Sequence, residues 1–205
     1  MIELLAFLAT VAVVSLSGVI MPGPVFAATV VRGYESKNAG ILIALGHGVV
    51  EFPLMFLIYL GFAQFVSAGV TMNIIGIAGG TVLIYMGARM LRARRGESER
   101  EIDPKHGSLV AGIATTAANP YFFLWWATVG LALITQSREF GLLGFLLFVP
   151  VHWLCDLSWC LLVSRTVFSS RRFWTERVRS GIFIVCGLIM IGFGIWFLLS
   201  GLGVC

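Results

Sequence analysis

Long stretches without Asp, Glu, Lys or Arg are the feature of this sequence that most limits its fold. They cover residues 4–31, 38–50, 52–88, 106–137, 140–155, 157–164 and 180–205. A helix that crosses a bilayer needs about 20 consecutive apolar residues. Only 12% of the 205 residues are charged, about half of the roughly 25% typical of soluble domains. The chain is therefore predicted to be an integral membrane protein, and neither a soluble domain nor a disordered segment.

The apolar stretches divide into six predicted membrane-spanning helices. The segment 52–88 is too long for one crossing, and its most polar part, 64–73, is the expected turn. The predicted helices lie near residues 3–32, 40–65, 72–92, 108–135, 140–165 and 180–201. The first helix is long enough to be broken or tilted. Because the stretches lack the ten-residue alternation of an outer-membrane barrel, the predicted fold class is all-α.

Basic residues are distributed unevenly over the predicted loops. Thirteen of the 14 Lys and Arg residues follow predicted helices one, three and five, and Arg138 lies in the other set of loops. Because basic loops stay in the cytoplasm, both termini are expected outside, in a multi-pass protein of the plasma or inner membrane. The N-terminus has no basic region before its apolar stretch, so we interpret it as a span and not as a signal peptide. Basic residues scattered between apolar stretches give no reason to expect nucleic-acid binding.

Similar motifs recur in the two halves of the sequence in the same order. Prolines interrupt helices one and four, His-x-x-x-acid pairs lie in helices two and five, and paired glycines lie in helices three and six. With three helices in each half, such a repeat is inverted, which is typical of secondary transporters whose site lies where the repeats meet. The sequence thus predicts one transporter domain with repeat one at about 1–92, a cytoplasmic linker at about 93–106 and repeat two at about 107–205.

Helices one and four each carry a proline break. Pro22-Gly23-Pro24 removes two backbone N–H donors and adds the conformational freedom of glycine. At membrane depth such a break is tolerated only inside protein or beside a water-lined cavity. The free N–H groups at the start of a half-helix suit a carboxylate, and a simple kink is the other interpretation. The predicted substrate-binding residues are Pro22, Gly23, Pro24, Thr116, Asn119 and Pro120.

Two carboxylates, Glu51 and Asp156, lie well inside the predicted spans. His47 precedes Glu51 by four residues and His152 precedes Asp156 by four, so each pair shares one helix face. A charge at the bilayer centre costs about 2.5–3.5 kcal/mol on insertion scales, so such residues usually line a pathway or form pairs. Histidine exchanges protons near neutral pH. The pairs therefore predict proton coupling or binding of a substrate cation, and a structural pair that holds helices together is the alternative.

The remaining motifs carry weaker signals. Glycines in helices three and six are expected to permit close helix contact: Gly76, Gly80, Gly87, Gly187 and Gly194. Aromatic residues after the break in helix four form either a cavity wall or an interfacial belt: Tyr121, Phe122, Phe123, Trp125 and Trp126. The sequence has no Cys-x-x-Cys and no His-Glu-x-x-His motif. We therefore expect no membrane-embedded redox enzyme or zinc protease, and no cofactor.

Five motifs follow one another along the whole chain in an order typical of one transporter family. They are Pro22-Gly23-Pro24, Arg32-Gly33, Gly46-His47-Gly48, Tyr85-Met86-Gly87 and Asn119-Pro120. Together they resemble the lysine exporter (LysE) superfamily of amino-acid exporters. The resemblance implies export of amino acids or similar small metabolites, usually driven by the proton gradient. This chain departs from the family at Tyr121, where many of its amino-acid exporters have a lysine that could meet the substrate carboxylate.

The hypothesis from the sequence is therefore a six-helix exporter that works by alternating access. Its expected partners are an amino acid as substrate, a proton as coupling ion and the lipid bilayer. The sequence leaves open whether the protein forms a homo-oligomer. The alternative is a divalent-metal exporter, since two histidines and two carboxylates are credible ligands for zinc, cobalt or nickel. That alternative requires His47, Glu51, His152 and Asp156 to come within a few ångströms of one ion.

Overall fold

The described part of the protein is built from helices. The computed structural model describes residues 1–62, 69–93 and 104–204, and within them every regular element is helical. The α-helices are α1 (Ile2–Val19), α2 (Pro24–Glu35), α3 (Ala39–Tyr59), α5 (Gly69–Ala93), α6 (Pro104–Ala117), α7 (Pro120–Trp125), α8 (Leu131–Ser137), α9 (Gly141–Ser170) and α10 (Glu176–Gly201). A π-helical segment, η1 (Trp126–Gly130), joins α7 to α8, and short 3₁₀ turns η2 (Arg138–Phe140) and η3 (Arg171–Phe173) flank α9. The all-α prediction is confirmed for these residues.

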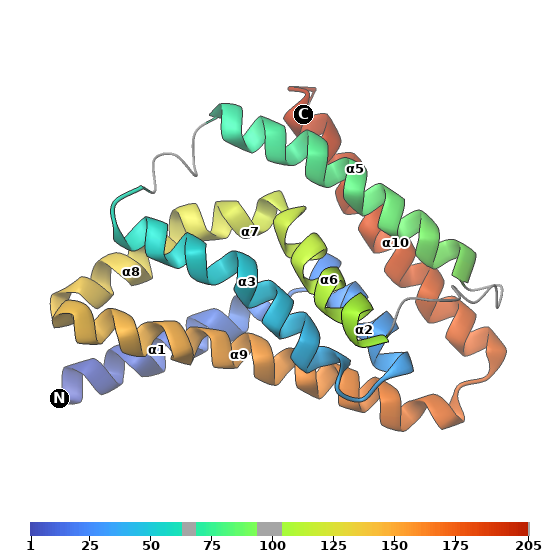
Figure 1. Ribbon diagram of the computed structural model, residues 1–205, viewed down its shortest axis with the longest axis horizontal. Coiled ribbons are helices and arrows are strands. Elements are labelled where there is room, and N and C mark those ends of the chain that lie inside the picture. The colour runs from blue at the N-terminus through green and yellow to red at the C-terminus, as the bar shows by residue number, and fades with distance from the viewer. Residues whose placement is uncertain (63–68, 94–103, 205) are drawn as a thin grey trace.

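Five helical stretches are long and apolar enough to cross a membrane. They are Ile2–Val19, Ala39–Tyr59, Met72–Arg92, Pro120–Phe173 and Glu176–Gly201. The fourth is 54 residues long and contains a reversal, because α8 and α9 lie side by side and meet at η2 (Figure 1). Gly141 follows η2 with a φ of +65°, a left-handed conformation that glycine adopts without strain. The reversal lies where the sequence predicts the boundary between two helices.

Both predicted helix breaks occur at their prolines. The first apolar stretch is divided because α1 ends at Val19 and α2 begins at Pro24. The other division falls between α6, which ends at Ala117, and α7, which begins at Pro120. Proline fits the first position of a helix, where its missing N–H costs no helical bond. The expected turn at 64–73 is wrong for its second half, because α5 already begins at Gly69, while 64–68 lie outside the described residues. The expected linker at 93–106 falls largely outside the described residues, and α6 begins within it at Pro104.

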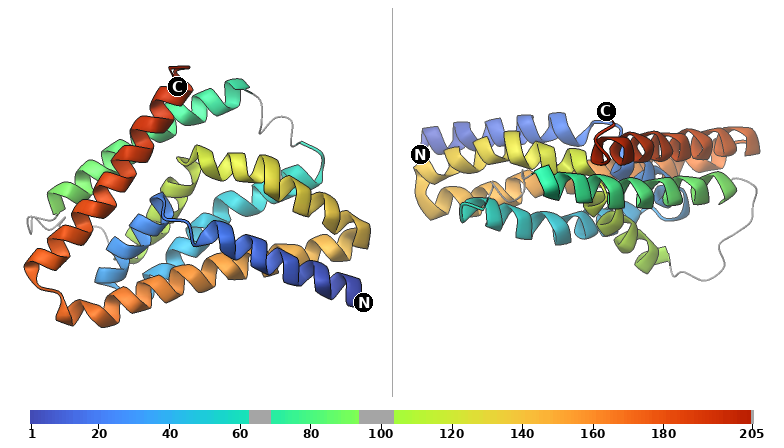
Figure 2. Two further views of the ribbon diagram at one scale, coloured as in Figure 1. Left: turned by 180° about the vertical axis from the view of Figure 1, so that it is seen from behind. Right: turned by 90° about the horizontal axis from the view of Figure 1, so that it is seen from above.

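Helices α5 and α10 form a pair that diverges from the remaining helices (Figures 1 and 2). Their backbones touch at the predicted glycines. A Cβ added to Gly80 would lie 2.5 Å from the carbonyl oxygen of Gly194, and one added to Gly87 would lie 2.6 Å from that of Gly187. The reciprocal contacts from Gly194 and Gly187 are equally short, at 2.7 and 3.0 Å. The prediction that these glycines permit close helix contact is confirmed, and we call this pair the arm and the helices α1–α3 and α6–α9 the body.

The connections of the helices gather at two ends of the molecule. Figure 1 shows that α2, α5 and α9 end, and α3 and α10 begin, on the same side. The described basic residues of the helix ends and turns on this side are Arg32, Lys37, Arg89, Arg92, Arg165, Arg171, Arg172, Arg177 and Arg179. Arg138, at the reversal between α8 and α9, instead donates to the backbone carbonyl of Tyr59. The N- and C-termini both lie away from the basic side (Figure 1).

Replacing Gly80 by leucine should loosen the arm. The new side chain would meet the backbone of α10, and overpacking of this kind typically costs about 1–3 kcal/mol. The measurement is the free energy of unfolding in mixed detergent micelles titrated with SDS. Gly192→Leu is the matched control on α10, because a Cβ at Gly192 meets nothing within 4 Å. An equal loss of stability in both variants would show that close glycine contact does not hold the arm together.

Candidate functional site

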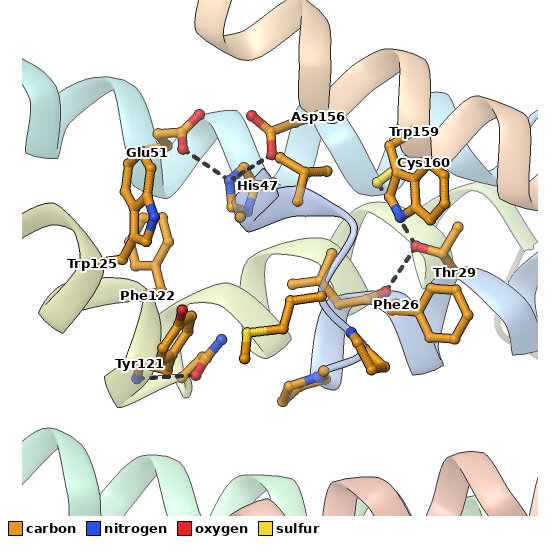
Figure 3. A pocket seen from close by; sticks show the side chains of 18 of the residues that line it. Phe26, Thr29, His47, Glu51, Tyr121, Phe122, Trp125, Asp156, Trp159 and Cys160 are labelled. Atoms are coloured by element: carbon orange, nitrogen blue, oxygen red, sulfur yellow. Dashed lines mark hydrogen bonds and ion pairs between the residues drawn. The ribbon is translucent and has the colours of Figure 1, made fainter. Parts of the chain in front are cut away.

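A cavity of about 300 Å³ lies where the two helix breaks meet α3, α9 and α10. Its wall includes the connection from α1 to α2, the start of α7, and side chains of α3 and α9 (Figure 3). The α10 helix contributes Phe193 and Trp196. Both breaks predicted from the proline motifs therefore reach one cavity. So do the two His–acid pairs, since His47, Glu51, His152 and Asp156 all line it.

Glu51 stands between two histidines from different helices. Its side chain is 1% exposed. His47 Nε2 of α3 lies 3.0 Å from Glu51 Oε1, and His152 Nε2 of α9 lies 3.2 Å from the same oxygen. Because an ionised carboxylate only accepts hydrogen bonds, both Nε2 atoms donate to it. The sequence paired each histidine with the acid of its own helix, whereas the structure brings both histidines to one carboxylate.

Asp156 completes the cluster at longer distances. Its Oδ1 lies 3.8 Å from His47 Nε2, and its Oδ2 lies 3.6 Å from His152 Nε2. These are ion-pair distances and exceed those of ordinary hydrogen bonds. Among the described residues, neither Glu51 Oε2 nor Asp156 Oδ2 has a hydrogen-bond partner. Buried polar atoms are nearly always bonded to protein, water or ligand, so these two oxygens are available to a cation or a proton.

Two hydroxyl groups hold the outer nitrogens of the histidines. Ser15 Oγ of α1 lies 2.7 Å from His152 Nδ1, and Thr116 Oγ1 of α6 lies 2.8 Å from His47 Nδ1. A hydroxyl both donates and accepts, so each contact suits a neutral and a protonated imidazole. Thr116, predicted to bind substrate, lies outside the cavity wall and is completely buried. Ser15 was missed, because a single serine in an apolar stretch carries no spacing signal.

The two helix starts at the cavity differ in capping. Pro22, Gly23 and Pro24 all line the cavity. Gly23 is the N-cap of α2 and supplies no side-chain hydrogen bond, so the first N–H groups of α2 lack helical partners. At α7, the corresponding N–H groups are bonded to Asn119. Its Oδ1 accepts from the Tyr121 N–H at 3.1 Å, and its backbone carbonyl accepts from the Phe122 N–H.

The predicted residues at the α7 start are also placed differently from those at α2. Asn119 lines the cavity and Pro120 does not. Because the first α7 donors are already bonded, α2 is the helix start that offers N–H groups to an anion. The sequence motifs alone did not distinguish the two breaks.

Aromatic rings form much of the remaining wall. Four of the five aromatic residues after the α7 break line the cavity: Tyr121, Phe122, Trp125 and Trp126. These four therefore form a cavity wall, the first of the two predicted alternatives. The rings of Trp126 and Trp125 lie 5.0 and 5.4 Å from that of His152. Rings from other helices were missed by sequence reasoning because no spacing marks them: Phe26, Trp159, Phe193 and Trp196.

The cluster meets the geometric condition for the metal alternative only in part, because three of the four predicted ligands come together and His152 is not among them. One ligand atom from each of His47, Glu51 and Asp156 lies within 4.8 Å of the others. Zinc bonds to such ligands are about 2 Å long. However, His47 Nε2 contacts Glu51 Oε1, and a nitrogen that donates a hydrogen bond cannot coordinate an ion with the same atom. Metal binding would therefore have to replace this hydrogen bond and release a proton.

Ser15→Ala should destabilise the protein by about 1–3 kcal/mol, because it leaves the buried Nδ1 of His152 without its partner. The measurement is again the free energy of unfolding in SDS-titrated micelles. Ser17→Ala is the control on the same helix, since Ser17 is exposed and bonds only to the backbone carbonyl of Val14. If the two variants unfold alike, the Ser15–His152 contact contributes nothing to the cluster.

Comparison with known proteins assigns these features to a family. The family model of the LysE type translocator matches residues 16–201. A Bacillus subtilis (strain 168) protein named "Putative amino acid efflux protein YcgF" is 24% identical over 187 residues, which cover 88% of this chain and 89% of that protein. No solved structure matches the chain. A match over this share of the sequence shows that the chain belongs to the LysE type translocator family of membrane transporters.

Proposed function

We propose that this transporter exports amino acids or similar small metabolites across the cell membrane and couples their export to proton entry. The observation that carries the proposal is one cavity in which Glu51 and Asp156 lie near an uncapped helix start. The family match and the efflux protein similar to this chain support the same class of substrate. Substrate-binding pockets measure roughly 300–1,000 Å³, and a cavity of about 300 Å³ suits one small molecule.

An amino acid has complementary charges for this cavity. Its ammonium group suits the unpartnered oxygens of Glu51 and Asp156. Its carboxylate suits the first N–H groups of α2, which follow Pro22-Gly23-Pro24. In this proposal Asn119 shapes the wall beside the substrate, while Thr116 acts through His47.

Proton coupling follows because a proton and the substrate's ammonium group compete for the same carboxylate oxygens of Glu51 and Asp156. A carboxylate that takes a proton loses its charge and with it the attraction for an ammonium group. Protonation of Glu51 or Asp156 from outside would release the amino acid there, and deprotonation toward the cytoplasm would prepare the site again. His47 and His152 serve as proton acceptors beside the carboxylates, and their hydroxyl partners suit both protonation states.

We further propose that the six predicted spans form two inverted three-helix repeats with both termini outside. The basic side of the molecule would then face the cytoplasm. The paired glycines of the arm support this symmetry, since Gly80 meets Gly194 and Gly87 meets Gly187 across antiparallel helices. Alternating access would proceed by rocking of the arm against the body, which share the wall of the cavity. The metal-export alternative is not favoured, because the efflux relative is named for amino acids.

Purified protein in liposomes should move amino acids only along with an opposing proton gradient. Liposomes loaded with a mixture of labelled amino acids and held at a more acidic outside pH are expected to lose label faster than liposomes without protein. A protonophore should slow this loss to the rate seen without a pH gradient, because it removes the proton driving force and leaves only the gradient of the amino acid. Failure of every amino acid to move would contradict the proposed function, and movement of Zn²⁺, Co²⁺ or Ni²⁺ under the same gradient would favour the metal alternative.

Glu51→Gln and Asp156→Asn should each reduce proton-driven flux by about tenfold or more, since a charge-assisted hydrogen bond contributes roughly 1.5–3 kcal/mol. Glu176→Gln is the control, because the Glu176 side chain is 82% exposed and pairs with Arg179 on the surface. Size-exclusion profiles check that all three variants fold. Unchanged flux in the double variant of Glu51 and Asp156 would exclude both carboxylates from the mechanism.

A further inference from the structure

Resting on the proposed function, we infer that the cavity selects amino acids whose side chain is bulky and apolar. The inference concerns the wall opposite the His–acid cluster, for which neither the family match nor the efflux relative specifies a ligand. It comes from three observations about this wall: its aromatic side chains, its lack of cations and the position of a free indole donor.

Aromatic side chains reach the cavity from two elements outside the cluster. Phe26 comes from α2, and Phe193 and Trp196 come from α10. The rings of Phe193 and Trp196 lie 6.2 Å apart, so they are neighbours on one helix face. Both side chains line the cavity, where they can contact a ligand. An apolar substrate side chain that replaces water on these rings gains free energy in proportion to the area it buries.

Charged substrate side chains find no suitable partner on this wall. Among the described residues that line the cavity, none is Lys or Arg. An acidic substrate side chain would therefore meet Glu51 and Asp156, beside which the basic residues His47 and His152 are already paired with these carboxylates. A basic side chain would compete with the substrate's own ammonium group for the same two carboxylates. A small hydroxyl side chain would lose water against rings that offer it few hydrogen bonds.

The polar end of the substrate has a place of its own beside α2. Trp159 Nε1 is a buried donor without a hydrogen-bond partner among the described residues. Trp159 precedes Cys160, whose sulfur lies 3.9 Å from Thr29 Oγ1 of α2 (Figure 3). This donor and the uncapped α2 start both suit the substrate carboxylate, while the carboxylates of α3 and α9 suit its ammonium group. With both charged groups so held, the side chain is left to face Phe193 and Trp196.

Selectivity should therefore follow the apolar size of the side chain. One methylene group in a hydrophobic pocket changes discrimination by about 10–200-fold. In the liposome assay, leucine, methionine and phenylalanine at equal concentration should leave at least about tenfold faster than serine, glutamate or lysine. Faster movement of serine, glutamate or lysine would overturn the inference and leave the proposed function standing. Movement of none of the six would also overturn the inference, and the proposed function would fall with it only if every other amino acid failed to move as well.

Variants of α10 test whether this wall sets the preference. Phe193→Ala and Trp196→Ala should each lower the ratio of leucine to serine flux by about tenfold. A ratio within one sample is independent of the amount of folded protein. Leu188→Ala is the control, because Leu188 is 55% exposed on the same helix and does not line the cavity. A ratio that is unchanged in both aromatic variants, or that falls equally in the control, would overturn the inference.

Discussion

The burial of Glu51 within an apolar protein is the constraint on which the rest of the site depends. A carboxylate that has lost its water requires donors from the protein. Glu51 obtains them from His47 and His152, and these obtain partners in turn from Thr116 and Ser15. The resulting series of hydrogen bonds runs through α1, α9, α3 and α6. Four helices are therefore held together by one requirement, and the same requirement places titratable groups beside the cavity.

The helix breaks serve the cavity in two different ways. At α2 the motif Pro22-Gly23-Pro24 leaves the helix start without a side-chain cap, so its N–H groups are available. At α7 Asn119 uses both its side chain and its carbonyl to close the equivalent groups. Two breaks that look alike in the sequence thus give one helix start with free N–H groups and one whose first N–H groups are already bonded. This asymmetry would suit the proposed substrate, which carries a single carboxylate.

The cavity and the arm together explain how a family fold can serve a particular substrate. In the proposed mechanism, the cluster of α3 and α9 and the start of α2 would meet the groups that all amino acids share. The α10 helix, which the arm contributes, carries Phe193 and Trp196 to the other side of the cavity. Because the arm packs through glycine contacts along its whole length, α5 and α10 can move as one unit. In the proposed mechanism, substrate selection and conformational change would therefore involve the same helix.

The sequence by itself determined the features that depend on composition and on spacing within one helix. Charge-free stretches predicted membrane helices, prolines located both breaks, and four-residue spacing placed each histidine and acid on one helix face. The tertiary structure decided what lies together across helices. His152 reaches Glu51 over 101 residues, and Ser15 reaches His152 over 137. Such contacts depend on how helices cross, which no local pattern specifies, so the convergence of both pairs on one carboxylate emerged only from the packed fold.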